Sequence, residues 1–207
     1  GLRAAAEAAD VDLFVHAPYI INVASTNNRI RIPSRKLLQQ VVTLAGEIGA
    51  KGVIVHGGHV TKDEDPQAGI DNWRKAMERL EPGAPVLIEN TAGGTNAMTR
   101  SLEMIERLFT ALDCTGAGFC LDTCHAFAAG LEFDSLIDDV INATGRIDLV
   151  HVNDSKGEFG SGQDRHANLG QGMIGAEAIA AVVKASGAPG VCETNPAGQA
   201  EDVAFLR

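Results

Sequence analysis

Six short apolar segments recur along the chain, and this repetition limits the fold more than any other feature. Each is rich in Val, Ile, Leu or Phe, and together they cover residues 12–19, 52–58, 85–91, 117–123, 148–154 and 190–195. Apolar runs of this length are typical of strands that are buried on both faces of a sheet. We therefore expect six buried strands.

The stretches between these segments have the spacing of helices. Apolar residues recur there every three or four positions, which predicts helices over residues 34–49, 65–80, 99–112, 134–145 and 176–187. The first ten residues, GLRAAAEAAD, have the composition of the end of an Ala-rich helix. Strands that alternate with helices predict right-handed βα units and a parallel sheet.

The composition favours one globular domain over residues 1–207, which we expect in the cytoplasm. Hydrophobic residues make up 45% of the chain, but no run approaches the roughly 18 apolar residues of a membrane span. The four cysteines include no CxxC pair, so we expect free thiols. The formal net charge of −10 opposes binding of a polyanion, unless bound cations concentrate positive charge at the binding site.

A potential metal ligand stands at the end of each expected strand. These residues are His16, His56, Glu89, Asp122, His151 and Glu193. The C-terminal ends of parallel strands form one rim, so the six side chains are expected to meet in one pocket. Any one of them alone is most simply an ordinary polar residue at a strand end. Six in succession predict bound cations, because a rim of unpaired buried charge is costly.

Two further elements add ligand types to this rim. His125 follows the strand-end Asp122 by three residues, and Asp164 and His166 lie in a long glycine-rich loop over residues 153–175. His125, Asp164 and His166 together could bind an ion of their own. Imidazoles and carboxylates without an obligatory thiolate suit Zn²⁺ or Mn²⁺. His59, the last residue of HGGH, is expected to be a loop residue or a support for a ligand.

Several long motifs resemble those of the endonuclease IV family of abasic-site DNA-repair enzymes. The motifs are HAPYIINVAS at 16–25, VHGGH at 55–59, LIENTAG at 87–93, GFCLDTCHAFAAG at 118–130, HVNDSKGEFGSGQDRHANLGQG at 151–172 and CETNP at 192–196. The resemblance implies a TIM (β/α)8 barrel of the xylose isomerase-like type, forming a single, incomplete catalytic domain over residues 1–207. Only six strands are recognisable, so we expect an N-terminally truncated chain that lacks the first two.

The resemblance also implies a cluster of three Zn²⁺ ions per chain, with Mn²⁺ as an alternative at one site. His16 and His56 would bind the first ion, and Glu89 would bridge it to the second. The second ion would also take Asp122, His151 and Glu193, and the third would take His125, Asp164 and His166. The implied catalytic residues are Glu89, Asp122, His151 and Glu193, and no side chain acts as the nucleophile.

The substrate implied by the resemblance is double-stranded DNA that contains abasic sites. Hydrolysis of the phosphodiester 5′ to the abasic sugar would leave a 3′-hydroxyl, as base excision repair requires. Tyr19 and Ile20 would enter the base stack, and Lys156 and Arg165 would contact phosphates. Arg29, Arg31 and Arg35 are weaker candidates for phosphate contacts. We expect a monomer that does not associate with membranes.

Two other functions are compatible with these residues. One is a metal-dependent sugar isomerase of the same barrel type, which needs only one or two ions and leaves the set His125, Asp164 and His166 unexplained. The other is an inactive, truncated metal-binding relative. Truncation also predicts a gap between the strands of His16 and Glu193, lower stability, and slower incision than by a chain extended upstream by about 50 residues.

Overall fold

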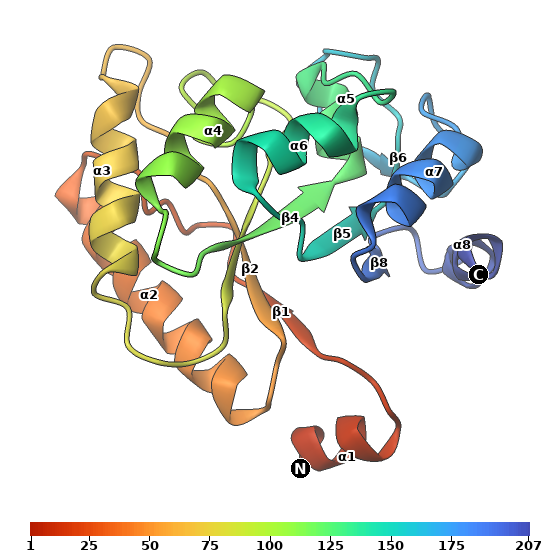
Figure 1. Cartoon of the computed structure of the whole chain (residues 1–207), viewed down its shortest axis with the longest axis horizontal. Coiled ribbons are helices and arrows are strands. Elements are labelled where there is room, and N and C mark those ends of the chain that lie inside the picture. The colour runs from red at the N-terminus through yellow and green to blue at the C-terminus, as the bar shows by residue number, and fades with distance from the viewer.

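A parallel six-stranded sheet forms the centre of the computed structural model, which describes residues 1–207 (Figure 1). The strands are β1 Phe14–His16, β2 Gly52–His56, β3 Val86–Glu89, β4 Gly118–Asp122, β5 Leu149–Val152 and β8 Gly190–Cys192. Each pairs with the strand before it in the order β1-β2-β3-β4-β5-β8. All six expected strands are confirmed. The two edge strands, β1 and β8, do not pair with each other, so the gap predicted between them is present.

Helices follow the strands and cover the outside of the sheet (Figure 1). They are α1 Leu2–Ala8, α2 Asn28–Glu47, α3 Pro66–Met77, α4 Leu102–Ala111, α5 Thr123–Ala129, α6 Leu136–Thr144, α7 Ala176–Ser186 and α8 Gln199–Leu206. The five expected helices are confirmed, four of them with bounds that differ by at most three residues. Helix α1 matches the Ala-rich start. The sequence interpretation did not include α5 and α8. No helix combines the length and the apolar character that a membrane span requires.

The predicted start of α2 at Ser34 is wrong. The helix begins at Asn28, where the Asn27 side chain accepts a hydrogen bond from the Arg29 backbone N–H, and it continues through Pro33. The Ser34 hydroxyl is buried and accepts a hydrogen bond of 3.0 Å from the backbone N–H of Asn22 instead. Ser34 therefore fastens the loop after β1 rather than capping a helix.

The long loop predicted over residues 153–175 contains a short antiparallel hairpin. Its strands are β6 Asp154–Ser155 and β7 His166–Ala167, in which Ser155 is paired with His166. The hairpin brings the Asp164–His166 segment back to the end of β5. Two-residue strands are too short to leave a periodic pattern in the sequence.

Side chains of the strands alternate between the outer and the inner face of the sheet. Outward-facing residues of β2, β3 and β4 pack against the helices in a cluster of 30 buried residues that includes Trp73, whose Nε1–H donates a 2.6 Å hydrogen bond to the Gly57 carbonyl. Those of β5, Val150 and Val152, form a smaller cluster with Ile179 of α7. The inward-facing residues form a separate small cluster of Ile54, Leu87, Cys120 and Leu149. Two positions further along these four strands stand His56, Glu89, Asp122 and His151. The strand period of two thus directs these polar residues into the same interior, at its C-terminal end.

Candidate metal centre

Glu89 lies at the centre of a ring of four imidazoles, three from different strands and one from helix α5. The side chain is only 1% exposed, and Oε2 is 3.1 Å from His16 Nε2 and 3.2 Å from His56 Nε2. The other oxygen, Oε1, is 3.0 Å from His151 Nδ1 and 3.4 Å from His125 Nδ1. Burial alone would raise the pKa of Glu89, but the four imidazoles hold it well below its usual range. Glu89 is therefore an ionised carboxylate in a buried position.

A second group joins Glu89 and His151 to two further carboxylates. The ligand atoms of Glu89, Asp122, His151 and Glu193 all lie within 4.8 Å of one another. His151 Nδ1 is 3.4 Å from Glu193 Oε2 and 4.0 Å from Asp122 Oδ2. The three carboxylates in this group would repel one another without positive charge between them. This group contains the same residues that the sequence resemblance implies for the second ion.

Asp164 lies between His125 and His166. Its carboxylate oxygens lie 3.1 Å from His125 Nε2 and 3.1 Å from His166 Nε2. Burial would lower the pKa of His125, but Asp122, Asp164 and Glu89 together raise it to about 12. Asp164 and Asp122 likewise outweigh burial and raise the pKa of His166 to about 9. In the metal-free protein, protons therefore occupy the positions that a cation could take.

Backbone carbonyls orient three of the imidazoles so that Nε2 points into the centre. Nδ1 of His16 lies 2.8 Å from the Ala17 carbonyl oxygen, Nδ1 of His125 lies 2.9 Å from that of Asn90, and Nδ1 of His166 lies 3.0 Å from that of Glu193. Nδ1–H is then the donor, so Nε2 is the nitrogen that would bind a metal after releasing its proton. The buried Nε2 atoms of His125 and His166 have no hydrogen-bond partner, since their contacts to Asp164 are close but poorly aligned. Such orphaned, pre-oriented imidazole nitrogens fit metal ligation.

Two asparagines that the sequence analysis did not identify hold Asp122 in place. The Asp122 backbone N–H donates a 2.7 Å hydrogen bond to the Asn90 side chain, and Asn153 Nδ2 donates one of 2.8 Å to Asp122 Oδ2. Asp122 Oδ1 also accepts a 2.6 Å bond from the His125 backbone N–H at the start of α5. Asn90 and Asn153 each directly follow a strand, which was the available signal for them. They fix the orientation of the carboxylate toward the centre.

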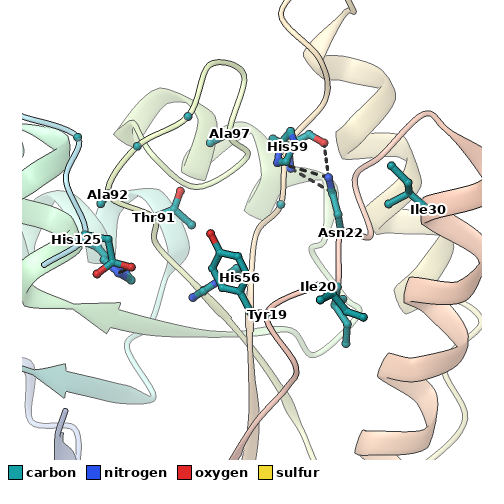
Figure 2. A pocket seen from close by; sticks show the side chains of 16 residues that line it. Tyr19, Ile20, Asn22, Ile30, His56, His59, Thr91, Ala92, Ala97 and His125 are labelled. Atoms are coloured by element: carbon teal, nitrogen blue, oxygen red, sulfur yellow. Dashed lines mark hydrogen bonds and ion pairs between the residues drawn. The ribbon is translucent and has the colours of Figure 1, made fainter. Parts of the chain in front are cut away.

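A cavity of about 620 Å³ opens beside this cluster (Figure 2). Its walls include Tyr19 and Ile20, which are 81% and 78% exposed, together with His56 and Thr91. The Tyr19 and His56 rings pack edge to face, with 5.4 Å between the ring centroids. His59 lines the same cavity but makes no contact with the ligand cluster, and Asn22 Nδ2 donates a 2.9 Å hydrogen bond to its carbonyl. The exposed apolar pair therefore stands at the mouth of the site.

The basic residues singled out from the sequence have different surroundings. Lys156 and Arg165 are both exposed and lie opposite each other across the β6–β7 hairpin, where the Lys156 N–H donates to the Arg165 carbonyl at 2.9 Å. Arg29 is also exposed, and Arg35 is half-buried. Arg31 donates to the carbonyl oxygens of Ser25 and Thr26, so its guanidinium supports the loop after β1. Arg31 is therefore less available to a ligand than Lys156 or Arg165.

The similarity of this chain to known sequences identifies the family to which it belongs. Residues 1–207 match the family described as xylose isomerase-like TIM barrel. The chain is 56% identical over 204 residues to the "Probable endonuclease 4" of Mycobacterium tuberculosis, an alignment that covers 99% of this chain and 81% of that protein. The chain belongs to the endonuclease IV family. Within this family, the "Probable endonuclease 4" of Mycobacterium leprae is 55% identical and covers 97% of this chain and 80% of its own length.

Solved structures agree with the assignment to the endonuclease IV family. Endonuclease IV from Thermus thermophilus superposes with a TM-score of 0.85 at 31% identity, covering 100% of this chain and 78% of the other. A D-tagatose 3-epimerase-like protein gives a TM-score of 0.83 at 21% identity, covering 99% of this chain and 79% of the other, and shares the fold alone. The family and the TIM-barrel fold class expected from the sequence are both confirmed.

Proposed function

We propose that this endonuclease IV family member hydrolyses the phosphodiester 5′ to abasic sites in double-stranded DNA and acts as a single catalytic domain and a monomer. The convergence of nine potential ligands at one end of the sheet supports this proposal most strongly. The nine are His16, His56, Glu89, Asp122, His125, His151, Asp164, His166 and Glu193. The relatives named endonuclease 4 supply the class of reaction.

The contacts among the nine residues favour three ions, with Zn²⁺ as the metal and Mn²⁺ as an alternative at one position. We assign His16, His56 and Glu89 to the first ion. Glu89, which faces both neighbouring groups, would also bind the second ion with Asp122, His151 and Glu193. His125, Asp164 and His166 would hold the third. Divalent ions supply Lewis-acid activation of water and of phosphate oxygens.

Within this assignment, Glu89, Asp122, His151 and Glu193 are the catalytic residues. They surround the most enclosed part of the centre, where Glu89, Asp122 and His151 are at most 2% exposed. These carboxylates would hold divalent cations beside the attacked phosphate, and the cations would supply the positive charge that the phosphate oxygens need in the reaction. No serine, threonine or cysteine hydroxyl or thiol stands among the nine ligands, so we propose direct attack by water.

The exposed pair Tyr19 and Ile20 would position the DNA at the cavity mouth. Apolar side chains that are this exposed on a rim can insert between base steps and bend the duplex. An abasic nucleotide has no base to unstack, so it moves out of the helix at low cost. Lys156 and Arg165 on the hairpin would then contact phosphates that flank the attacked one.

An incision assay on a labelled duplex with one abasic site tests this proposal. We expect cleavage only at the abasic position, loss of activity with a chelator, and recovery with Zn²⁺. The new 3′ end should support extension by a DNA polymerase, because hydrolysis leaves a free hydroxyl whereas β-elimination leaves a blocked sugar fragment. A His166→Gln protein serves as the inactive control.

The same samples separate the alternatives. Intact metal binding without incision would indicate a non-catalytic relative and would overturn the proposal. Metal-dependent epimerisation of a ketose without incision would instead indicate a sugar isomerase, as the likeness to the epimerase-like fold allows.

A further inference from the structure

One acidic residue of the C-terminal helix α8 is buried although its neighbours are exposed. Asp202 is 4% exposed, whereas Glu201 and Val203 on either side lie at the surface. No Lys, Arg or His forms an ion pair with Asp202. A buried carboxylate without a counter-ion requires strong hydrogen bonds to offset its lost hydration.

Three donors provide these hydrogen bonds. Thr194 Oγ1 and Asn168 Nδ2 each donate to Asp202 Oδ2 at 2.6 Å, and the backbone N–H of Leu169 donates to Oδ1 at 3.0 Å. Thr194 belongs to the segment after β8, and Asn168 and Leu169 belong to the segment after β7. Asp202 therefore joins two loops that are more than twenty residues apart in the sequence.

Both loops carry proposed metal ligands next to the residues that Asp202 holds. Thr194 directly follows Glu193, and Asn168 lies two residues after His166. The two ligands also touch each other, since Nδ1 of His166 lies 3.0 Å from the Glu193 carbonyl oxygen. A displacement of either loop would therefore move Glu193 and His166 relative to each other.

Apolar packing explains only part of the position of α8. Leu206 packs against the small cluster of Val150, Val152 and Ile179, but Val203 and Phe205 are 37% and 49% exposed, and Asp202 is the one buried residue of the helix. Polar contacts also attach α8, since Gln199 Nε2 donates a 2.7 Å hydrogen bond to the Cys192 carbonyl. A helix whose one buried residue is hydrogen-bonded to ligand-bearing loops is suited to positioning them.

We propose that Asp202 is a positioning residue of the metal centre, which fixes the Glu193 and His166 loops so that ligands of two different ions are presented together. This inference rests on the metal ligation assigned under the proposed function. The first ion, held by His16, His56 and Glu89, lies on other strands and should not depend on Asp202. The expected defect is therefore confined to part of the cluster.

Variants at Thr194 and Asp202 test this inference. Thr194→Val removes one hydroxyl without changing the size of the side chain, Thr194→Ser retains it, and Asp202→Asn replaces one acceptor oxygen by a donor. Glu201→Gln is the matched control, because it makes the same change in charge on an exposed neighbour. Each protein is loaded with Zn²⁺ and challenged with a weak chelator. Metal per chain and release rate are measured by mass spectrometry and a zinc-sensitive dye, and unfolding temperature is measured with and without metal.

We expect Thr194→Val and Asp202→Asn to release part of their metal about 10- to 100-fold faster while one ion per chain stays bound. Thr194→Ser and Glu201→Gln should behave as the parent protein. Equal losses of unfolding temperature with and without metal, at unchanged metal release, would show that Asp202 only stabilises the fold and would overturn the inference. A parent protein that binds no metal would overturn it as well. A parent protein that holds three ions but does not incise abasic DNA would refute the proposed function alone.

Discussion

Replacing Asp154 by Asn should loosen the glycine-rich loop that follows the β6–β7 hairpin. Asp154 is fully buried, and its two oxygens accept five backbone N–H groups. Oδ1 accepts from Ser155 at 2.8 Å and Ile174 at 2.9 Å, and Oδ2 accepts from Gly170 at 3.0 Å, Gly172 at 3.0 Å and Gly175 at 3.4 Å. The loop is wrapped closely around this carboxylate, because a Cβ at Gly172 would lie 2.5 Å from Asp154 Oδ1.

The magnitude of this effect follows from the number of donors. An Asn side chain keeps one acceptor oxygen and places an amide NH₂ where the other oxygen stood, so in either orientation at least two backbone N–H groups face a donor. Each unsatisfied buried donor costs about 1–3 kcal/mol, so two of them cost about 2–6 kcal/mol. Because these N–H groups are only part-buried, we expect a loss of about 3 kcal/mol in the free energy of unfolding. For a chain of this size, the unfolding temperature should fall by about 6–12 °C.

Thermal unfolding and hydrogen exchange together measure this effect. Backbone amides of residues 168–175 should lose protection in Asp154→Asn, since their acceptor is lost. Asp63→Asn is a matched control because Asp63 is exposed and makes no side-chain hydrogen bond. An Asp154→Asn protein that unfolds within about 2 °C of the parent and keeps the protection of the loop would refute the reasoning.

Three further predictions concern the metal centre, the DNA contact and the cysteines. Glu89→Gln should lower both metal content and incision rate by at least about 100-fold, because the loss of a central ligand must exceed the 10- to 100-fold effect of a supporting residue; near-normal incision would remove Glu89 from the mechanism. Replacing Tyr19 and Ile20 by Ala should raise the KM for abasic DNA about 10-fold or more through lost stacking. Since both side chains are exposed, the unfolding temperature should stay unchanged, and an unchanged KM would argue against insertion. Burial raises the pKa of the Cys120 and Cys124 thiols, so alkylation followed by mass spectrometry should modify the exposed Cys114 in the native protein and leave those two unmodified until unfolding.

The sequence was sufficient to predict the strands and the six polar residues at their ends, because both follow from simple periodicity. A strand buried on both faces is a short apolar run, and the residue at its end reaches the rim of a parallel sheet. Because the side chains of a strand alternate with a period of two, Ile54 and His56 lie on the same inner face of β2. Cys120 and Asp122 share the inner face of β4 for the same reason. His125, Asp164 and His166 do not follow from this period and were named from their residue types. That the nine residues bind metal, and which ion each binds, stays a prediction.

Elements that depend on tertiary contacts were not predictable from the sequence. Ser34 has the chemistry of a helix cap, but its hydroxyl is used by Asn22. Helix α5 begins directly at the strand-end Asp122, which serves both as a candidate ligand and as its cap, so no loop separates strand from helix. In helix α8, Val203 and Phe205 are exposed and Asp202 is buried, and two of the three partners of Asp202, Asn168 and Leu169, are more than thirty residues away in the sequence. Pairwise contacts of this kind have no local signature in a single sequence.

Removing the metal should weaken DNA binding as well as abolish incision. The ligand set contains four carboxylates, in a chain whose formal net charge is already −10. Three divalent ions would give the centre a net charge of about +2, which favours a phosphate backbone. Without metal, four histidines take up protons more readily, since the pKa values of His16, His125, His151 and His166 are all raised. Four protons can at most neutralise the four carboxylates.

The metal-free protein should therefore bind an abasic duplex at least about 10-fold more weakly at neutral pH and low salt. Its affinity should fall further as the pH rises from neutral through about 9, because His166, whose pKa is raised to about 9, then loses its proton, whereas the metal-loaded protein should change little as long as its ligands stay bound. Fluorescence anisotropy with a labelled duplex measures both forms, and an undamaged duplex is the control for non-specific binding. If the metal-free and metal-loaded proteins bind the abasic duplex equally well at neutral pH, surface cations such as Lys156 and Arg165 provide the affinity. The charge of the metal centre would then serve the chemical step alone.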